Sequence, residues 1–232
     1  VASGKGGVGK STVAVNLAAA LASSGAKAGL LDADIYGPSI PLMLDIQQTP
    51  MLVKVRDPET GEEVKRMAAP EKYGLKLMSL GFLAEGDAPV MWRGPMVACA
   101  VRQMLTETDW GELDYLVVDL PPGTGDAQIS LAQIVPLTGV VIVMTPQDVA
   151  LTIATKALRM FEHLNTPVLG IVENMATFVC PNCGEESEIF GHTGAGQRAA
   201  EELGVRFLGR IPLDPRIVTD SDAGIPTFIR DP

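Results

Sequence analysis

The sequence has few cysteines, no long apolar run and fewer basic than acidic residues, and each of these shortages excludes a class of protein. Its three cysteines are too few and too unevenly spaced for a secreted disulfide framework. No apolar run approaches the roughly 20 residues that cross a bilayer. Basic residues number 18 against 28 acidic ones, for a formal net charge of −10. We therefore expect a protein of a reducing compartment, the cytoplasm, with neither nucleic acid nor membrane as a partner, because both favour a basic surface.

The bulk composition suits an ordinary globular protein. A hydrophobic content of 47% is ample for a core, and 232 residues suit a single α/β domain over 1–232. Val1 stands just before a glycine-rich stretch, where a first strand should still be completing. We therefore expect a truncated N-terminus, which leaves an organelle open as the location.

The most informative stretch reads GKGGVGKST and fits the P-loop pattern G-x-x-x-x-G-K-[ST]. Its glycines let backbone N–H groups face inward at a helix N-terminus and bind phosphate. Lys10 is expected to reach the β- and γ-phosphates, and the Ser11 hydroxyl to bind Mg²⁺. A flexible turn before a helix is the alternative, but the amphipathic segment that follows favours a nucleoside triphosphate site. The predicted phosphate-binding residues are Gly4, Lys5, Gly6, Gly7, Val8, Gly9, Lys10, Ser11 and Thr12.

A pair of carboxylates follows the next apolar run, which predicts a buried strand over 26–31. Asp32 and Asp34 stand two residues apart at its carboxyl end, where open α/β sheets place their ligands. We expect them to manage Mg²⁺ and water at the γ-phosphate. A polar loop that only caps the next helix is the alternative.

A second acidic strand end occurs at 115–120, where YLVVDL precedes a Pro-Pro-Gly turn. An acidic residue that ends an apolar strand downstream of a P-loop is typical of a Walker B motif. Asp119 is then expected to hold Mg²⁺ through water, and Gly123 to offer its N–H to the γ-phosphate.

The remaining chain alternates between strand and helix patterns, which predicts a doubly wound, mostly parallel sheet with a small hairpin insertion in 45–73. Asn174 ends one strand, where its amide would read a base edge or cap the strand. The loop at Pro212 is expected to wall the base. Predicted helices cover 10–24, 96–107, 126–135, 147–163 and 194–203, and predicted strands cover 26–31, 75–80, 115–120, 139–144, 167–173 and 206–211.

Cys99 and the segment of bulky residues before it carry weaker signals. Cys99 lies among Val and Ala in a predicted helix, so we expect a buried, inert thiol. Trp92 and Arg93 suit an interface anchor or, for the tryptophan, a core position.

Cys180 and Cys183 form a C-x-x-C motif with Pro and Gly, which predicts a tight knuckle that directs both sulfurs at one metal. A redox site is less favoured, because no strand precedes the motif and no helix starts within it. Four-thiolate sites need two such pairs, and His192 is the nearest other ligand type. A two-fold dimer with one pair from each subunit satisfies this need. Zinc and a [4Fe–4S] cluster both fit four thiolates.

Together these residues resemble the Mrp/Nbp35 (ApbC-like) family of iron–sulfur cluster carrier ATPases, within the MinD/ParA group. Lys5 corresponds to the extra lysine of that group's deviant Walker A motif. The resemblance extends over the whole chain through the segments DADIYGPSIP, YGLKLMSLGFL, WRGPM, DYLVVDLPPGTGD, TPQD, VENM, the C-x-x-C and GRIPLDP. Partition and septum ATPases share the P-loop but not the C-x-x-C or WRGPM.

The resemblance implies a homodimeric, slow ATPase that delivers a cluster to apoproteins. Lys5 would cross the interface to the partner's nucleotide, and Asp34 would activate the attacking water. Asp32 and Asp119 would serve Mg²⁺, and Asn174 would contact adenine. The thiolates of both subunits would hold a labile bridging [4Fe–4S] cluster. The alternative function is a positioning or regulatory ATPase switch of the MinD/ParA type, with structural zinc at the C-x-x-C.

Overall fold

A computed structural model describes residues 1–34, 37–56, 61–83 and 94–232. The chain divides into two compact units. Unit 1 comprises Val1–Val13 and Leu120–Thr219, and unit 2 comprises Ala14–Asp119 and Asp220–Pro232. Each unit has its own sheet, and each is described separately below.

The sheet of unit 2 has the strand order β4-β5-β1-β6. Strand β1 (Ala28–Asp32) pairs in parallel with β5 (Leu75–Ser79) on one side and β6 (Tyr115–Asp119) on the other. The short β4 (Glu71–Lys72) adds antiparallel to β5. All five residues of β1 are buried, as expected for a central parallel strand.

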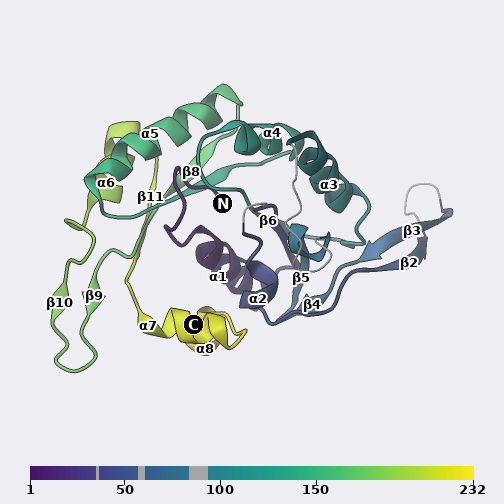
Figure 1. Cartoon of the computed structure of the whole chain (residues 1–232), viewed down its shortest axis with the longest axis horizontal. Helices are drawn as coiled ribbons and strands as arrows, with labels where there is room; N and C mark the ends of the chain where they lie inside the picture. Colours follow the sequence, from purple (N-terminus) through teal and green to yellow (C-terminus); the bar gives the residue numbers. More distant parts are fainter. Residues whose placement is uncertain (35–36, 57–60, 84–93) are drawn as a thin grey trace. The chain divides into compact units, whose positions relative to one another are not determined.

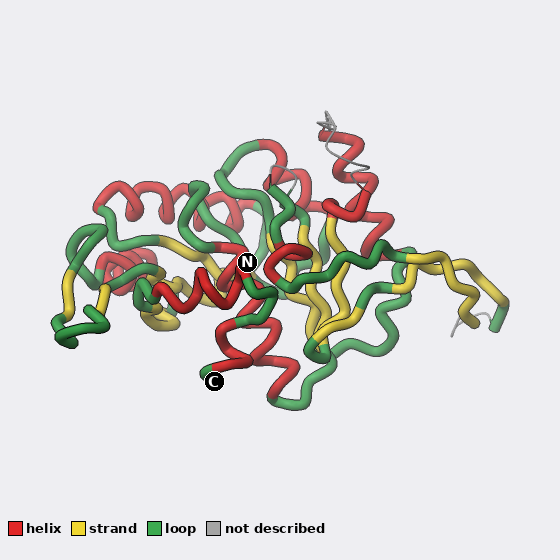
Figure 2. Tube along the Cα trace, turned by 60° about the horizontal axis from the view of Figure 1, so that its bottom comes forward, coloured by secondary structure: helices red, strands yellow, loops and turns green. Residues whose placement is uncertain are grey.

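The predicted hairpin insertion is confirmed in unit 2. Strands β2 (Met51–Arg56) and β3 (Glu63–Ala68) pair antiparallel along their whole length. In Figure 2 they form a two-stranded ribbon that extends from the rest of the unit. Residues 57–60, between these two strands, lie outside the described residues.

The prediction for Cys99 is wrong, because its thiol is exposed. It lies on α3 (Gly94–Thr106), whose buried side chains Val97, Val101 and Met104 recur at helical spacing. Cys99 falls on the other side of this stripe. Neighbouring apolar residues in the sequence therefore do not make a helical position buried.

The end of the chain folds into two short helices that the sequence analysis did not predict, α7 (Pro215–Asp222) and α8 (Thr227–Arg230). Asp214 accepts the Arg216 N–H at 2.8 Å, just before the first turn of α7. An Asp–Pro pair is a helix start signal, since Asp caps the first turn and Pro fits its first position. Within unit 2, Arg230 pairs with Asp220 at 2.9 Å.

Unit 1 holds a three-stranded parallel sheet of order β11-β8-β7. Its strands are β7 (Val140–Met144), β8 (Val168–Asn174) and β11 (Phe207–Ile211). The start of the chain lies beside β7, where Ala2 bridges in parallel to Ile142. The P-loop thus follows directly from a segment that pairs with this sheet.

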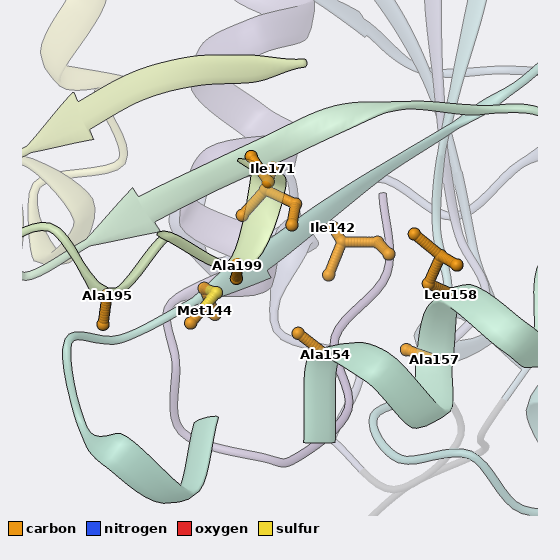
Figure 3. Packing of buried hydrophobic residues seen from close by; sticks show 9 residues of the cluster. Ile142, Met144, Ala154, Ala157, Leu158, Ile171, Ala195 and Ala199 are labelled. Carbon is orange, nitrogen blue, oxygen red and sulfur yellow. The ribbon is translucent and has the colours of Figure 1, made fainter. Parts of the chain in front are cut away.

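Side chains of successive β7 residues pack on different partners. Ile142 and Met144 belong to a buried cluster with Ile171 of β8, α5 (Asp148–His163) and α6 (Ala195–Leu203), shown in Figure 3. Val143 instead packs with Val8 and Val13. Side chains alternate between the two faces of a strand, so helices α5 and α6 cover one face and the P-loop segment the other.

The observed elements confirm the predicted fold class, a mostly parallel sheet with helices. Each predicted long element corresponds to an observed one. Helices α1 (Lys10–Ser23) and α4 (Asp126–Ile134) begin at the predicted residues. The short elements α2 (Ile40–Met43), β9 (Phe178–Val179), β10 (Glu186–Ser187) and the 3₁₀ turn η1 (Leu80–Leu83) were not predicted. The assignment of the whole chain to one domain stays a prediction.

Candidate nucleotide and metal sites

The P-loop of unit 1 adopts the backbone that its glycines predict. Gly7 and Gly9 have φ values of 76° and 80°, in the left-handed region that favours glycine. Helix α1 begins at Lys10, and the Val13 N–H donates to the Gly9 carbonyl at 3.0 Å. The Lys10 ammonium is buried and lies 3.4 Å from the Ser11 hydroxyl. The stretch is therefore a glycine-rich loop that leads into a helix N-terminus, the arrangement whose backbone N–H groups bind phosphate in other proteins.

Two P-loop glycines also lack room for any side chain. A Cβ at Gly9 would lie 2.2 Å from Nδ2 of Asn174, and a Cβ at Gly4 would lie 2.0 Å from Cγ2 of Ile153. Gly7 has nothing within 4 Å of such an atom. Close packing against β8 and α5 therefore fixes Gly9 and Gly4, whereas backbone conformation alone explains Gly7.

Asn174 and the Pro212 segment lie at the same end of the unit 1 sheet. The Asn174 amide is buried and donates to the Val8 carbonyl at 2.8 Å. Asn174 is the register partner of Ile211, the residue before Pro212. The Leu213 N–H also donates to the Thr177 carbonyl at 2.7 Å. The structure thus places both predicted base-contacting residues at one end of the sheet, and the Asn174 amide contacts the P-loop backbone directly.

Gly123 and Lys5 have hydrogen-bond partners within unit 1. The Gly123 N–H donates to the Ser3 carbonyl at 2.9 Å, so a phosphate contact requires that this bond be exchanged. The Lys5 ammonium donates to the side-chain oxygen of Gln147, which follows β7. Sequence reasoning missed Gln147 as a partner of Lys5, although it lies in the TPQD segment.

The predicted carboxylates gather in unit 2, at the carboxyl ends of neighbouring strands. Asp32 is the register partner of Ser79 on β5 and of Asp119 on β6, and all three side chains are fully buried. The Ser79 hydroxyl donates to Asp32 Oδ2 at 2.9 Å, and the Asp34 N–H donates to Asp32 Oδ1 at 3.2 Å. Ser79 was missed, although a polar residue that ends a buried strand is a signal for it.

Burial, together with the charge of Asp119, raises the pKa of Asp32 to about 7. Two adjacent buried carboxylates are stabilised by a cation, and oxygen ligands suit Mg²⁺. No group of three or more His, Cys, Asp or Glu side chains within the described ranges could hold a metal. The donor set fits Mg²⁺, which typically takes one or two carboxylates and completes its shell with water and phosphate oxygens.

The C-x-x-C motif forms the tip of the β9–β10 hairpin in unit 1, which Figure 1 shows extending away from α5 and α6. The Cys180 N–H donates to the Glu185 carbonyl at 2.9 Å, and the Gly184 N–H donates to the Cys180 carbonyl at 2.8 Å. Gly184 has a φ of 73°, which closes the turn. Cys183 is exposed and Cys180 half-buried, so the knuckle is accessible.

The knuckle favours the thiolate form that binds metals. Backbone N–H groups of Cys183 and then Asn182, followed by the Cys183 thiol, lower the pKa of Cys180. His192, the nearest other ligand type in the sequence, has its Nδ1 3.0 Å from a Glu188 carboxylate oxygen. Across the described parts of the chain, no third His, Cys, Asp or Glu completes a site with this pair.

Several predictions concern residues that the structure does not describe. Trp92 and Arg93 of the WRGPM segment lie outside the described residues, as do Ile35 and Tyr36 of DADIYGPSIP. In the described ranges, no helix combines the length and the apolar character that crossing a membrane requires.

Comparison with known proteins gives close relatives along the whole chain. It is 53% identical to the iron-sulfur protein required for NADH dehydrogenase of Arabidopsis thaliana mitochondria, covering 100% of this chain and 71% of that protein. It is 49% identical to the iron-sulfur cluster transfer protein NUBPL of Dictyostelium discoideum, covering 100% and 69%. Identity to the iron-sulfur cluster carrier protein of Escherichia coli K12 is 52%, covering 100% of this chain and 60% of that one.

Solved structures show the same fold. A nucleotide-binding protein from Archaeoglobus fulgidus in complex with ADP has a TM-score of 0.83 at 40% identity, covering 100% of this chain and 87% of that one. The septum site-determining protein MinD of Pyrococcus horikoshii, complexed with Mg-ADP, has a TM-score of 0.68 at 20% identity, covering 100% and 88%. Residues 1–232 match the ParA family described as the NUBPL iron-transfer P-loop NTPase. The chain therefore belongs to this family of P-loop NTPases, which have the MinD/ParA-like fold.

Proposed function

We propose that this protein binds and hydrolyses ATP and, as a homodimer, carries a bridging [4Fe–4S] cluster that it transfers to apoproteins. One observation carries the proposal: an accessible hairpin presents Cys180 and Cys183, and the described residues supply no third ligand. A second copy of the chain supplies the two missing thiolates, because a two-fold axis duplicates the pair. The names of the relatives, iron-sulfur cluster carrier and transfer proteins, support this reading.

The P-loop residues of unit 1 bind the triphosphate in this proposal. Backbone N–H groups of Gly4–Thr12 hold the phosphates, and Lys10 neutralises charge on the transferred phosphoryl group. Asn174 and the Pro212 loop contact the base. The ADP bound to the Archaeoglobus fulgidus protein supports a nucleotide as the ligand.

The carboxylates have separate roles. Asp32 and Asp119, with the Ser11 hydroxyl, hold Mg²⁺, which supplies charge neutralisation for the phosphates when it is bound. Asp34 orients the attacking water. Lys5 leaves Gln147 and contacts the nucleotide of the partner subunit. Hydrolysis is therefore slow unless the dimer is formed, because each half-site lacks one lysine.

Nucleotide hydrolysis tests the first half of the proposal. We expect Lys10→Ala to abolish ATPase activity, and Lys5→Ala to lower it by at least about tenfold, as for loss of a group that stabilises transition-state charge. Lys156→Ala, at an exposed lysine on α5, is the matched control and keeps wild-type activity. Full activity in both P-loop variants would defeat the nucleotide assignment.

Anaerobic reconstitution with iron and sulfide tests the second half. We expect a coloured protein with visible iron–sulfur absorption and four iron atoms per dimer, as a [4Fe–4S] cluster held by four thiolates requires. Size-exclusion chromatography should show the dimer only when the cluster or ATP is bound. A colourless protein with one zinc per dimer would instead favour a structural metal and overturn the carrier assignment.

A further inference from the structure

Glu173 is a fully buried carboxylate for which the proposed chemistry provides no role. Its two oxygens accept the Gly194 N–H at 2.9 and 3.2 Å, and Oε2 accepts the Arg210 Nε–H at 3.3 Å. A buried carboxylate is strongly unfavourable unless such partners satisfy it. These bonds therefore fasten Gly194, the residue before α6, to the end of β8.

The residue after Glu173 contacts the P-loop instead. Asn174 donates its amide to the Val8 carbonyl at 2.8 Å. Successive side chains of a strand point to opposite faces, so these two residues carry contacts on both sides of β8. A movement of the P-loop at Val8 therefore acts on the same strand end that holds Gly194.

Gly194 is the point where the cysteine hairpin returns to the body of unit 1. Its neighbour Thr193 makes two bonds there: its hydroxyl donates to the Ala176 carbonyl at 3.1 Å, and its N–H donates to Glu188 Oε1 at 2.7 Å. Ala176 lies where the hairpin leaves β8, and Glu188 lies one residue after β10. Thr193 thus closes the base of the hairpin across both of its arms.

The hairpin itself has little intrinsic rigidity. β9 and β10 contain two residues each and pair only with one another. An isolated two-stranded hairpin is marginally stable, so its direction depends on how its base is held. Small changes at Thr193 and Gly194 therefore change where Cys180 and Cys183 point.

A second contact links the same base to the other end of the P-loop. A Cβ at Gly191 would lie 3.1 Å from the Pro146 carbonyl oxygen, so the two backbones are in close contact. The next residue, Gln147, accepts the hydrogen bond from Lys5. The return segment Gly191–Gly194 is therefore in contact with neighbours of both Val8 and Lys5.

We infer that Glu173 and Thr193 are positioning residues that couple nucleotide binding at the P-loop to the geometry of the Cys180–Cys183 hairpin. The inference rests on the proposed function, since it assumes that a nucleotide occupies the P-loop. Nucleotide contact shifts Val8 and releases Lys5, and β8 transmits the shift through Glu173 to the hairpin base. Coupling between two sites requires such a connected element that both sites bias.

The alkylation rate of the cysteines tests this inference in the full-length protein without a cluster or zinc on its thiols. The protein is treated with iodoacetamide in the presence and in the absence of Mg·ATPγS. Mass spectrometry of peptides then measures the alkylation of Cys180 and Cys183 separately from that of the exposed Cys99. In the wild type, we expect the nucleotide to change the rates at the hairpin by about fivefold or more, the lower range of typical site-to-site couplings. Thr193→Val and Glu173→Gln should reduce this change to less than about twofold while the nucleotide Kd stays within about twofold, because neither residue touches the P-loop.

Matched variants separate coupling from general damage. Thr193→Ser keeps the hydroxyl and should restore the nucleotide effect. Thr177→Val makes the same change at the hairpin base, at a hydroxyl without a hydrogen bond in the described structure, and should behave like the wild type. If Glu173→Gln does not fold, Thr193→Val decides the result.

The outcomes distinguish this inference from the proposed function. A nucleotide effect that persists in Thr193→Val and Glu173→Gln overturns the coupling role and leaves the carrier function standing. A wild type that binds nucleotide with no change at the cysteines also overturns it. A wild type that binds no nucleotide overturns the proposed function instead.

Discussion

Asp32 and Asp119 are register partners at the carboxyl ends of β1 and β6, and both side chains are fully buried. Two neighbouring carboxylates in a buried site oppose one another's ionisation. The fold accepts this unfavourable arrangement at the place where the proposed function needs Mg²⁺ ligands. Stability and function should therefore respond in opposite directions to substitution here.

Asp32→Asn should stabilise the Mg²⁺-free protein at pH 8 by on the order of 1–2 kcal/mol and lower ATPase activity at least about tenfold. The pKa of Asp32 is raised to about 7, so the folded state retains its proton longer than the unfolded chain does. Wild-type stability therefore falls as the pH rises from about 4 towards 7, and the loss persists above that range. An asparagine at position 32 does not ionise, so Asp32→Asn does not lose this part of the free energy of unfolding as the pH rises.

Urea unfolding at pH 5 and pH 8 measures the difference between Asp32→Asn and the wild type. It should be larger at pH 8 than at pH 5, because only the first part of the loss has developed at pH 5. Asp222→Asn, at an exposed carboxylate, is the matched control. A stabilisation of equal size at both pH values would contradict the origin assigned to it.

Alanine substitutions along the P-loop should differ in a fixed order. Gly6→Ala should cost little, because Gly6 has no positive φ and its nearest neighbour, Pro122, lies 4.0 Å from an added Cβ. Gly7→Ala should cost about 1 kcal/mol for its left-handed conformation. Gly9→Ala should cost about 1–3 kcal/mol more, because its Cβ would also overlap Asn174. Chemical denaturation without nucleotide gives the three values, and an equal loss at Gly7 and Gly9 would refute the close packing.

Asn174 should stabilise the P-loop even when no nucleotide is bound. Asn174→Ala removes the bond to the buried Val8 carbonyl and should lower the free energy of unfolding by about 1–3 kcal/mol. Asn174→Asp places an acceptor against that carbonyl and should lower it further at pH 8. Calorimetry of the nucleotide-free proteins tests this order. Equal stability of all three proteins would mean that Asn174 acts on the nucleotide alone.

The three cysteines should separate cleanly in reconstitution. Cys180→Ala and Cys183→Ala each leave one thiolate per subunit and should lose the visible iron–sulfur absorption. Cys99→Ala removes an exposed thiol on α3 and should keep this absorption. Iron and sulfide analysis of the three variants side by side checks this, and retention of four irons by Cys183→Ala would show that another ligand completes the site.

The sequence predicted the long elements well because their patterns are local. The buried run of β6 and the P-loop glycines depend on residues near one another in the chain. The same locality explains why Asp119 could be placed at the end of a strand before the structure. Cys99 shows the limit, since its exposure depends on which side of α3 packs, and composition alone does not give that.

The contacts that organise the candidate sites were harder to predict from the sequence. Ser79 bonds Asp32 across 47 positions, and Asn174 bonds Val8 across 166. Neither partner can be read from spacing, because strand register brings Ser79 to Asp32, and packing of the P-loop against the end of β8 brings Val8 to Asn174. The short β9 and β10 were missed for a related reason, as two-residue strands have no periodicity to detect.

The division of the chain has a practical consequence for protein engineering. The boundaries of the two units fall at Val13–Ala14, Asp119–Leu120 and Thr219–Asp220, so the chain passes between the units three times. Neither unit corresponds to one uninterrupted stretch of a gene. A simple truncation cannot isolate either half, and a recombination library that exchanges whole units would need three crossover points, the first inside α1 and the third inside α7.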